Sequence, residues 1–252
     1  MKYVRAGYEG RTIHGFIQGD EIEVFCCDAV AHPEAKPTGE RIKLSEVRLL
    51  APCAPTKVVA VGINYRDHAG EMGHDLPEEP VIFLKPSTSV IGPDDVIVRP
   101  AQSSRVDYEA ELALVIGREC RNVSAADARQ YIFGYTCCND VTARDLQKKD
   151  GQWTRAKGFD TFCPLGPWIE TELDAGNVSV ESRLNDKVMQ HSGTSLLINS
   201  IPRLVEFASR VMTLLPGDVI TTGTPSGIGP MQSGDTVEIE VGGIGILRNT
   251  VR

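Results

Sequence analysis

The stretch VDYEAELALVIG, residues 106–117, has the pattern of a strand entering a hydrophobic core, yet it carries two glutamates in its first half. Residues two apart in a strand share a face, so Glu109 and Glu111 project side by side. Two like charges at that spacing repel, and burying them without compensation is costly. One interpretation is a strand end whose acidic face is solvated. The other is a hard cation held by carboxylate oxygens.

A third carboxylate elsewhere in the sequence favours the interpretation that these glutamates bind a cation. Asp140 ends a second predicted buried strand, YIFGYTCCND, residues 131–140. Three acidic ligands without a histidine or thiolate favour Mg²⁺ or Mn²⁺ and make zinc a poor fit. An octahedral ion held by three protein oxygens keeps positions open, and a 2-oxo acid can chelate it through its carboxylate and keto oxygens.

The polar segment NYRDHAGEMG, residues 64–73, is a candidate lid. His68 and Glu71 are three apart and would share one face of a helical turn. A carboxylate beside a histidine orients the imidazole and raises its basicity, as a general base requires. The alternative is a surface histidine with an incidental acidic neighbour. Gly70 and Gly73 would allow the segment to move.

Lys157 is a further candidate, because it lies between Ala156 and Gly158, where backbone can approach a ligand closely. Its ammonium would stabilise an enolate or a carboxylate. The alternative is a solvated loop lysine. The turn TGTPSGIG, residues 222–229, lacks the ending and the following helix of a phosphate loop, which excludes that interpretation.

Composition limits the class of protein. The chain has 252 residues, of which 41% are hydrophobic, enough for a large domain with a small companion. The formal net charge of −8 argues against nucleic acid or an anionic membrane as a partner. Without a signal peptide or membrane span in the sequence, we expect a soluble cytoplasmic protein. Seven cysteines without a CxxC pair indicate reduced thiols.

We expect two domains. Residues 1–50 alternate polar and apolar positions around a turn at Gly19-Asp20, which predicts a small β domain. Residues 51–252 would form the main domain, in which KVVAVG and VIFLKP are short buried strands.

Three helices and one further hairpin are predicted in the main domain. One helix begins at Ser124, a second lies within residues 141–151, and a third lies within residues 199–218. The hairpin turns at Asn185-Asp186. Many strands and few helices, without regular βαβ alternation, predict an α+β fold built on β-sheet layers.

Together these segments resemble the fumarylacetoacetate hydrolase family over about residues 57–252. The matching pieces, in the family's order, are VGINYRDHAGEMG, FLKPSTSVIGPDD, VDYEAELALVIG, GYTCCNDVTARDLQ, WTRAKGFDTFCPLGP and LLPGDVITTGTPSGIG. The N-terminal unit resembles the small domain ahead of the catalytic domain in many bacterial members. The resemblance implies a β-rich mixed β-sandwich roll, commonly assembled as a homodimer.

The resemblance also implies roles for individual residues. The implied ligands of Mg²⁺ or Mn²⁺ are Glu109, Glu111 and Asp140, with Asp67 as a minor additional option. The implied catalytic residues are His68, Glu71 and Lys157. The implied substrate contacts are Arg144, Gln147 and Thr224.

The family does not fix the reaction, because its members include hydrolases, isomerases and decarboxylases of 2-oxo acids. The segment DLQKKDGQWTRAKGFDTFCPLGP most resembles the bacterial isomerase and decarboxylase group, so we expect action on an intermediate of the 2-hydroxyhepta-2,4-diene-1,7-dioate type. The alternatives are an acylpyruvate or fumarylpyruvate hydrolase and an oxaloacetate decarboxylase. Outside these, a non-catalytic Ca²⁺-binding module and an inactive relative are further hypotheses, against which the intact motif set argues.

Overall fold

The computed structural model describes residues 1–72 and 76–252 and consists mainly of β-strands. The strands are β1 (Lys2–Tyr8), β2 (Arg11–Gln18), β3 (Glu21–Phe25), β4 (Pro37–Lys43), β5 (Arg48–Leu49), β6 (Lys57–Gly62), β7 (Val81–Pro86), β8 (Val90–Ile91), β9 (Val96–Ile97), β10 (Val106–Tyr108), β11 (Ala110–Ile116), β12 (Ile132–Asn139), β13 (Thr142–Ala143), β14 (Cys163–Glu170), β15 (Ser179–Leu184), β16 (Lys187–Gly193), β17 (Val219–Thr221), β18 (Gly229–Pro230), β19 (Thr236–Val241) and β20 (Gly245–Val251). The α-helices are α1 (Arg66–Met72), α2 (Arg144–Asp150), α3 (Thr154–Lys157) and α4 (Ile201–Val211). The 3-10 helices are η1 (Leu44–Glu46), η2 (Ser87–Ser89), η3 (Ala128–Tyr131) and η4 (Thr194–Leu196).

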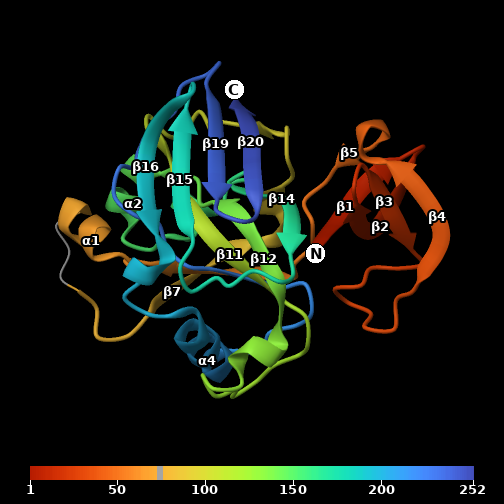
Figure 1. Ribbon diagram of the computed structural model, residues 1–252. Coiled ribbons are helices and arrows are strands. Elements are labelled where there is room, and N and C mark those ends of the chain that lie inside the picture. Colours follow the sequence, from red (N-terminus) through yellow and green to blue (C-terminus); the bar gives the residue numbers. More distant parts are fainter. Residues whose placement is uncertain (73–75) are drawn as a thin grey trace.

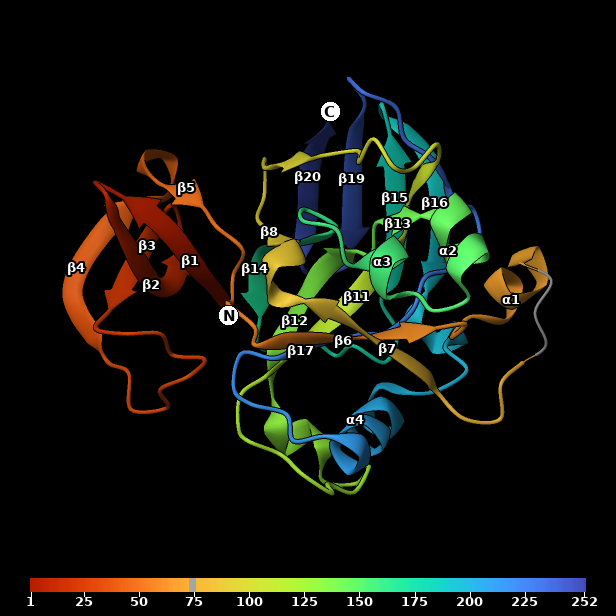
Figure 2. The same cartoon turned by 180° about the vertical axis from the view of Figure 1, so that it is seen from behind.

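Within the described residues the strands form three sheets. The largest has the order β4-β3-β2-β1-β14-β12-β11-β17-β6-β7, with β5 beside β1 and β8 beside β14. The second has the order β16-β15-β19-β20-β9, and the third has the order β13-β10-β18. Figures 1 and 2 show β15, β16, β19 and β20 at one end of the main body and α4 at the other. The predicted α+β fold of sheet layers is confirmed.

The first five strands form a unit beside the main body (Figure 1). Its own apolar cluster consists of Val4, Ala6, Ile13, Ile22, Val24 and Ile42. The predicted hairpin is confirmed, since β2 pairs with β3 around Gly19, whose φ is 67°. Strand β1 also pairs with β14, with Tyr3 opposite Ile169, so this unit extends the largest sheet. The predicted division after residue 50 falls in residues 50–56, which form neither helix nor strand.

Strand β11 is buried along its whole length. Its even-numbered residues join the main apolar cluster, to which α4 and the second sheet also contribute. The odd-numbered residues Ala113 and Val115 join a different cluster on the other face, because successive side chains of a strand alternate. Glu111 lies on this second face, where the apolar cluster gives way to carboxylates.

Two predicted elements differ in detail. Residues 106–117 form two strands, because β10 pairs with β13 and β18 whereas β11 pairs with β12 and β17. Glu109 lies where the partners change. The helix predicted from Ser124 is only the 3-10 turn η3, since Ser124 Oγ donates to Asp127 at 2.6 Å and β12 already begins at Ile132.

The remaining predicted elements are confirmed. Hairpin β15–β16 turns at Asn185 and Asp186, with φ values of 51° and 66°. Helix α2 is followed directly by its capping residue Gly151, whose φ is 70°. No helix in the part of the chain that the structure describes is long and apolar enough to cross a membrane. All seven cysteines are free, and five of them are buried. Gly73 of the predicted lid lies outside the described residues.

Candidate active site

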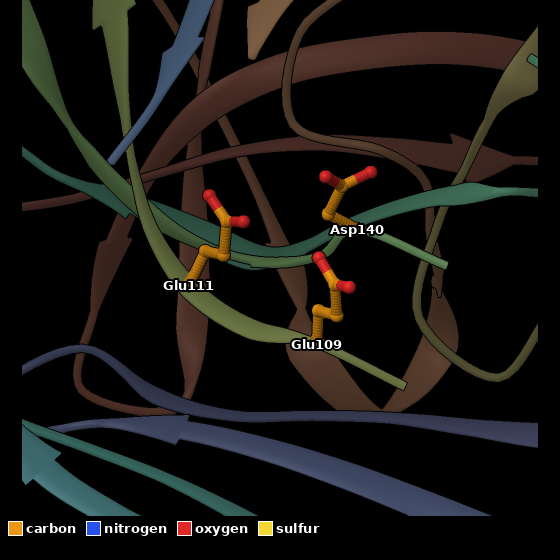
Figure 3. A group of neighbouring side chains, drawn as sticks. All are labelled: Glu109, Glu111 and Asp140. Carbon is orange, nitrogen blue, oxygen red and sulfur yellow. The ribbon is translucent and has the colours of Figure 1, made fainter. Parts of the chain in front are cut away.

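Three carboxylates meet beside the ends of the central strands β11 and β12 (Figure 3). The pairing of β11 with β12 sets Ala110 opposite Asn139, so Glu109 and Asp140 also lie opposite each other. One oxygen from each of Glu109, Glu111 and Asp140 lies within 4.8 Å of the others. The three residues are 3%, 1% and 1% exposed, so the solvated alternative for the acidic face is wrong.

Three buried cations, Lys157, Arg144 and Lys85, form ion pairs with these carboxylates. Lys157 Nζ donates to Glu109 at 2.7 Å and to Asp140 at 2.6 Å. Arg144 donates to Glu109 through Nη2 and to Asp107 through Nε. Lys157 is 2% exposed, which contradicts the solvated-loop alternative. Its position follows from the short helix α3, of which it is the last residue.

The two glutamates have opposite electrostatic environments. Burial by itself raises the pKa of Glu109, but the ammonium of Lys157 and the guanidinium of Arg144 outweigh burial and hold that pKa below its ordinary value. Burial and the neighbouring carboxylate of Asp140 raise the pKa of Glu111 well above its ordinary value. Glu111 accepts a hydrogen bond from the backbone N–H of Gly223 at 2.8 Å. Within the described residues no cation pairs with Glu111, so negative charge is least compensated there.

This donor set fits a hard divalent cation. All three groups offer oxygen, the ligand atom that Mg²⁺ and Mn²⁺ prefer, and burial keeps the carboxylates from being hydrated by bulk water. The under-compensated Glu111 is where an added positive charge is most favourable. Asp67 instead accepts a hydrogen bond from Ser226 Oγ at 2.8 Å, which turns it toward the turn at residues 224–227.

Helix α1 carries the predicted His/Glu pair. His68 Nδ1 and Glu71 Oε2 are 3.0 Å apart, and the Glu71 Oε1 atom accepts the N–H of Gly227 at 3.1 Å. His68 is 7% exposed, so it is not a surface histidine. With Nδ1 engaged by the carboxylate, Nε2 is the nitrogen left for proton transfer.

The carboxylates open into a cavity of about 300 Å³, within the size range of small-molecule sites. Eight of the nine predicted site residues line this catalytic pocket: His68, Glu109, Glu111, Asp140, Arg144, Gln147, Lys157 and Thr224. The ninth, Glu71, does not line the pocket but contacts Nδ1 of His68. Helix α2 presents Arg144 and Gln147 on one face, and Arg144 Nη1 donates to Gln147 Oε1 at 2.7 Å.

Two polar residues of the site were not found from the sequence. Lys85 on β7 is fully buried and donates to Asp140, so each oxygen of that carboxylate has its own lysine. Gln190 on β16 donates to Thr224 Oγ1 at 2.8 Å and accepts the N–H of Ala110 at 3.0 Å. The only local signal for Lys85 is a lysine inside the apolar run VIFLKP. Gln190 gives no local signal, since it alternates with exposed residues in a hairpin.

Two aromatic rings complete one wall of the catalytic pocket. Phe83 and Trp153 pack edge to face with ring centroids 5.2 Å apart, and the Lys157 ammonium lies 5.2 Å from the Phe83 ring. Trp153 lies so close to Gly62 that a Cβ there would come within 2.5 Å of the indole. A glycine at position 62 is therefore required for this wall.

Fold and site together define a β-rich enzyme whose pocket combines buried carboxylates with a lysine and a histidine. The family model described as fumarylacetoacetate (FAA) hydrolase C-terminal matches residues 57–252, and a second, described as Rv2993c-like, N-terminal, matches residues 1–52. The chain therefore belongs to the fumarylacetoacetate hydrolase family. Membership in this family of enzymes argues against the non-catalytic Ca²⁺-binding hypothesis.

Two solved structures that resemble the chain along its whole length are named as isomerases. The 5-carboxymethyl-2-hydroxymuconate delta-isomerase of Mycobacterium smegmatis is 51% identical, with a TM-score of 0.93, over 100% of this chain and 99% of that one. The 2-hydroxyhepta-2,4-diene-1,7-dioate isomerase of Mycobacterium marinum is 46% identical, with a TM-score of 0.92, over 100% and 98% of the chains.

More distant relatives differ in the reaction that they are named for. The mitochondrial oxaloacetate tautomerase Fahd2a of Rattus norvegicus is 40% identical over 222 residues, which cover 83% of this chain and 71% of that one. The maleylpyruvate hydrolase of Sphingobium sp. SYK-6, solved with manganese(II) and pyruvate, is 32% identical, with a TM-score of 0.83 over 100% and 98% of the chains.

Proposed function

We propose that this protein is a divalent-metal-dependent isomerase that interconverts the enol and keto forms of a 2-oxo acid, with an intermediate of the 2-hydroxyhepta-2,4-diene-1,7-dioate type as its substrate. The observation that carries the proposal is that His68, Lys157 and the three carboxylates all line one catalytic pocket. Isomerisation needs only a proton to leave one atom of the substrate and return to another, so no bond of the carbon skeleton breaks.

The chain's own residues divide this work. His68 Nε2 would take the proton, while Glu71 holds the ring in the required tautomer through Nδ1. The Lys157 ammonium would stabilise negative charge as it develops on the substrate oxygen. Arg144 and Gln147 would bind the substrate carboxylate from α2, and Thr224 would border it from the turn after β17.

We propose Mg²⁺ or Mn²⁺ as the cofactor, held by Glu109, Glu111 and Asp140. The ion would supply Lewis-acid stabilisation of negative charge on the oxo and carboxylate oxygens. The oxygen donor set supports this choice, and so does the manganese(II) in the related hydrolase. A homodimer remains a prediction, which light scattering on the purified protein would check.

Two other reactions are second candidates. Oxaloacetate tautomerisation is supported by the relative named an oxaloacetate tautomerase, and oxaloacetate decarboxylation is kept from the sequence resemblance. Hydrolysis is supported by the His68 and Glu71 pair, because a histidine oriented by a carboxylate can also activate water. The two isomerases of higher identity weigh in favour of proton transfer on a longer unsaturated diacid over oxaloacetate and over cleavage.

A panel of 2-oxo and 2,4-dioxo acids tests the proposal, with NMR of the products. Isomerisation retains the carbon skeleton, decarboxylation removes one carbon as CO₂, and hydrolysis yields two fragments. We expect unchanged skeletons and loss of activity in His68→Gln. Cleaved or shortened products would replace the proposed reaction with a second candidate, and no turnover on the whole panel would support the inactive-relative hypothesis.

A further inference from the structure

A second hollow adjoins the catalytic pocket and shares a wall with it. This outer hollow has a volume of about 210 Å³ and is lined by Glu71, Arg105, Arg144, Lys148 and Ile228. Arg144 and Lys148 also line the catalytic pocket, so the two spaces meet at helix α2. The outer hollow therefore lies directly beside the catalytic pocket, on the Arg144 side of the carboxylates.

The cationic side chains that line the outer hollow differ in how many of their hydrogen-bond donors already have a partner. Arg144 is bound to Asp107, Glu109 and Gln147. Arg105 uses Nε and Nη2 on Asp107, at 2.8 and 3.1 Å, which leaves Nη1.

Lys148 differs from both arginines. It is exposed, and no carboxylate among the described residues pairs with its ammonium. The one acid of the hollow, Glu71, already accepts from His68 and from the N–H of Gly227. The outer hollow thus offers unused positive charge at Lys148 and at one edge of Arg105.

The spacing of residues along α2 places the positive charge of Lys148 a short distance from the catalytic pocket. Lys148 follows Arg144 by four residues, so both lie on the same helical face, about 6 Å apart along the axis. The Arg144 end is next to the carboxylate cluster, and the Lys148 end faces the outer hollow. A short ligand with a carboxylate at each end would place one carboxylate near Arg144 and the other near Lys148.

We propose that Lys148, assisted by Arg105, is a specificity-determining residue that binds the second, distal carboxylate of a dicarboxylic substrate. This inference rests on the proposed function in that the 2-oxo end of the substrate lies at the carboxylate cluster. Lys148 contributes to the affinity for the distal group and leaves the proton transfer at His68 unchanged.

The test compares ligands that differ only in the distal carboxylate. The probes are 2-oxoglutarate against 2-oxopentanoate and, one carbon longer, 2-oxoadipate against 2-oxohexanoate. Dissociation constants are measured by calorimetry on the full chain loaded with Mg²⁺, in wild type and in the variants Lys148→Gln, Lys148→Arg and Lys149→Gln. Lys149 is the matched control, because it is exposed on the same helix, has the same charge and lines neither hollow.

We expect wild type to bind the better-fitting diacid more tightly than its monoacid. Lys148→Gln should weaken diacid binding about tenfold, as expected for one lost hydrogen bond to a charged group. Binding of the monoacids should stay within about twofold, Lys148→Arg should retain the preference, and Lys149→Gln should resemble wild type.

Several outcomes would overturn this inference. The first is equal wild-type affinity for the diacid and the monoacid of each pair. The second is an equal loss of affinity for diacid and monoacid in Lys148→Gln. The third is an equal change in diacid affinity in Lys148→Gln and Lys149→Gln. These outcomes do not depend on turnover. A protein that prefers diacids through Lys148 but converts none of the panel would refute the proposed reaction alone.

Discussion

Buried charges in the site are paired to different degrees, and Asp140 and Glu109 have cation partners that Glu111 lacks. Asp140 has a lysine on each oxygen, Lys157 on one and Lys85 on the other. Removing one partner of a buried ion pair leaves an uncompensated charge in a low dielectric, which is much more costly than losing a surface pair. Lys85 reaches no other carboxylate among the described residues, so holding Asp140 is its evident role.

Lys85→Met should therefore destabilise the metal-free protein strongly. We expect the free energy of unfolding to fall by about 3 to 5 kcal/mol, as for other broken buried ion pairs. Urea denaturation in the presence of a chelator measures this difference. Lys149→Met is the control, because an exposed lysine without a buried partner should change stability by no more than about 0.5 kcal/mol. Similar small effects in both variants would contradict the role given to Lys85.

Glu111 should make the metal-free protein less stable as the pH rises. Its pKa in the folded state lies above the ordinary value, so the folded protein holds a proton that the unfolded chain has already released. The free energy of unfolding consequently declines from the ordinary pKa of a glutamate up to the raised value. Glu111→Gln has no such proton, so its stability relative to wild type should increase over that range.

Denaturation series between mildly acidic and mildly basic pH, with chelator, follow this difference. Glu119→Gln makes the same substitution at an exposed position and is the matched control. A difference between Glu111→Gln and wild type that stays constant with pH would refute the prediction. Metal affinity should show the opposite trend and rise with pH, since binding requires the ionised carboxylate.

At the scale of elements, helix α1 is held over the catalytic pocket by two contacts with one turn. Asp67 accepts from Ser226 Oγ, and Glu71 accepts from the N–H of Gly227. Gln190 holds this turn in place, because it donates hydrogen bonds to Thr224 Oγ1 and to the carbonyl of Pro225. The position of His68 therefore depends on β16 and on the turn after β17 as well as on its own helix.

Ser226→Ala should loosen α1 without unfolding the protein. Loss of one hydrogen bond, worth about 1 kcal/mol, should speed amide exchange within α1 about fivefold. Hydrogen–deuterium exchange with mass spectrometry resolves this segment. Ser124→Ala removes a comparable bond to Asp127 far from the site, so it should leave exchange in α1 unchanged. Equal exchange in α1 for both variants would show that the tether does not hold the helix.

At the scale of the whole molecule, the site joins strands that are far apart in sequence. Glu111 comes from β11, Asp140 follows β12, and Gly223 follows β17, so an ion at the carboxylates would tie these central strands together. A ligand that binds only the folded state stabilises it in proportion to the logarithm of its concentration.

Loading with Mg²⁺ or Mn²⁺ should raise the thermal midpoint of the whole chain. At one hundred times the dissociation constant the gain is about 2.7 kcal/mol. Differential scanning calorimetry with and without chelator measures the shift, and Asp140→Asn should abolish most of it. An equal shift in this variant would mean that the ion binds elsewhere.

Much of the fold and part of the site could be predicted because their signals are local. Alternation in residues 106–117 put Glu109 and Glu111 on one face, and three-residue spacing paired His68 with Glu71, since strand and helix periods operate between near neighbours. The turn at Asn185-Asp186 was likewise evident from a short segment. Family resemblance then assigned roles to positions that local patterns had left open.

The sequence by itself therefore determined the strands, the acidic face and the candidate residues of the site. Only the tertiary structure decided that the acids are buried, that Lys85 and Lys157 share Asp140, and that Lys148 faces an outer hollow. The physical reason is that these contacts join residues on different elements, and their formation depends on which strands pair and in which register. No local periodicity carries that information.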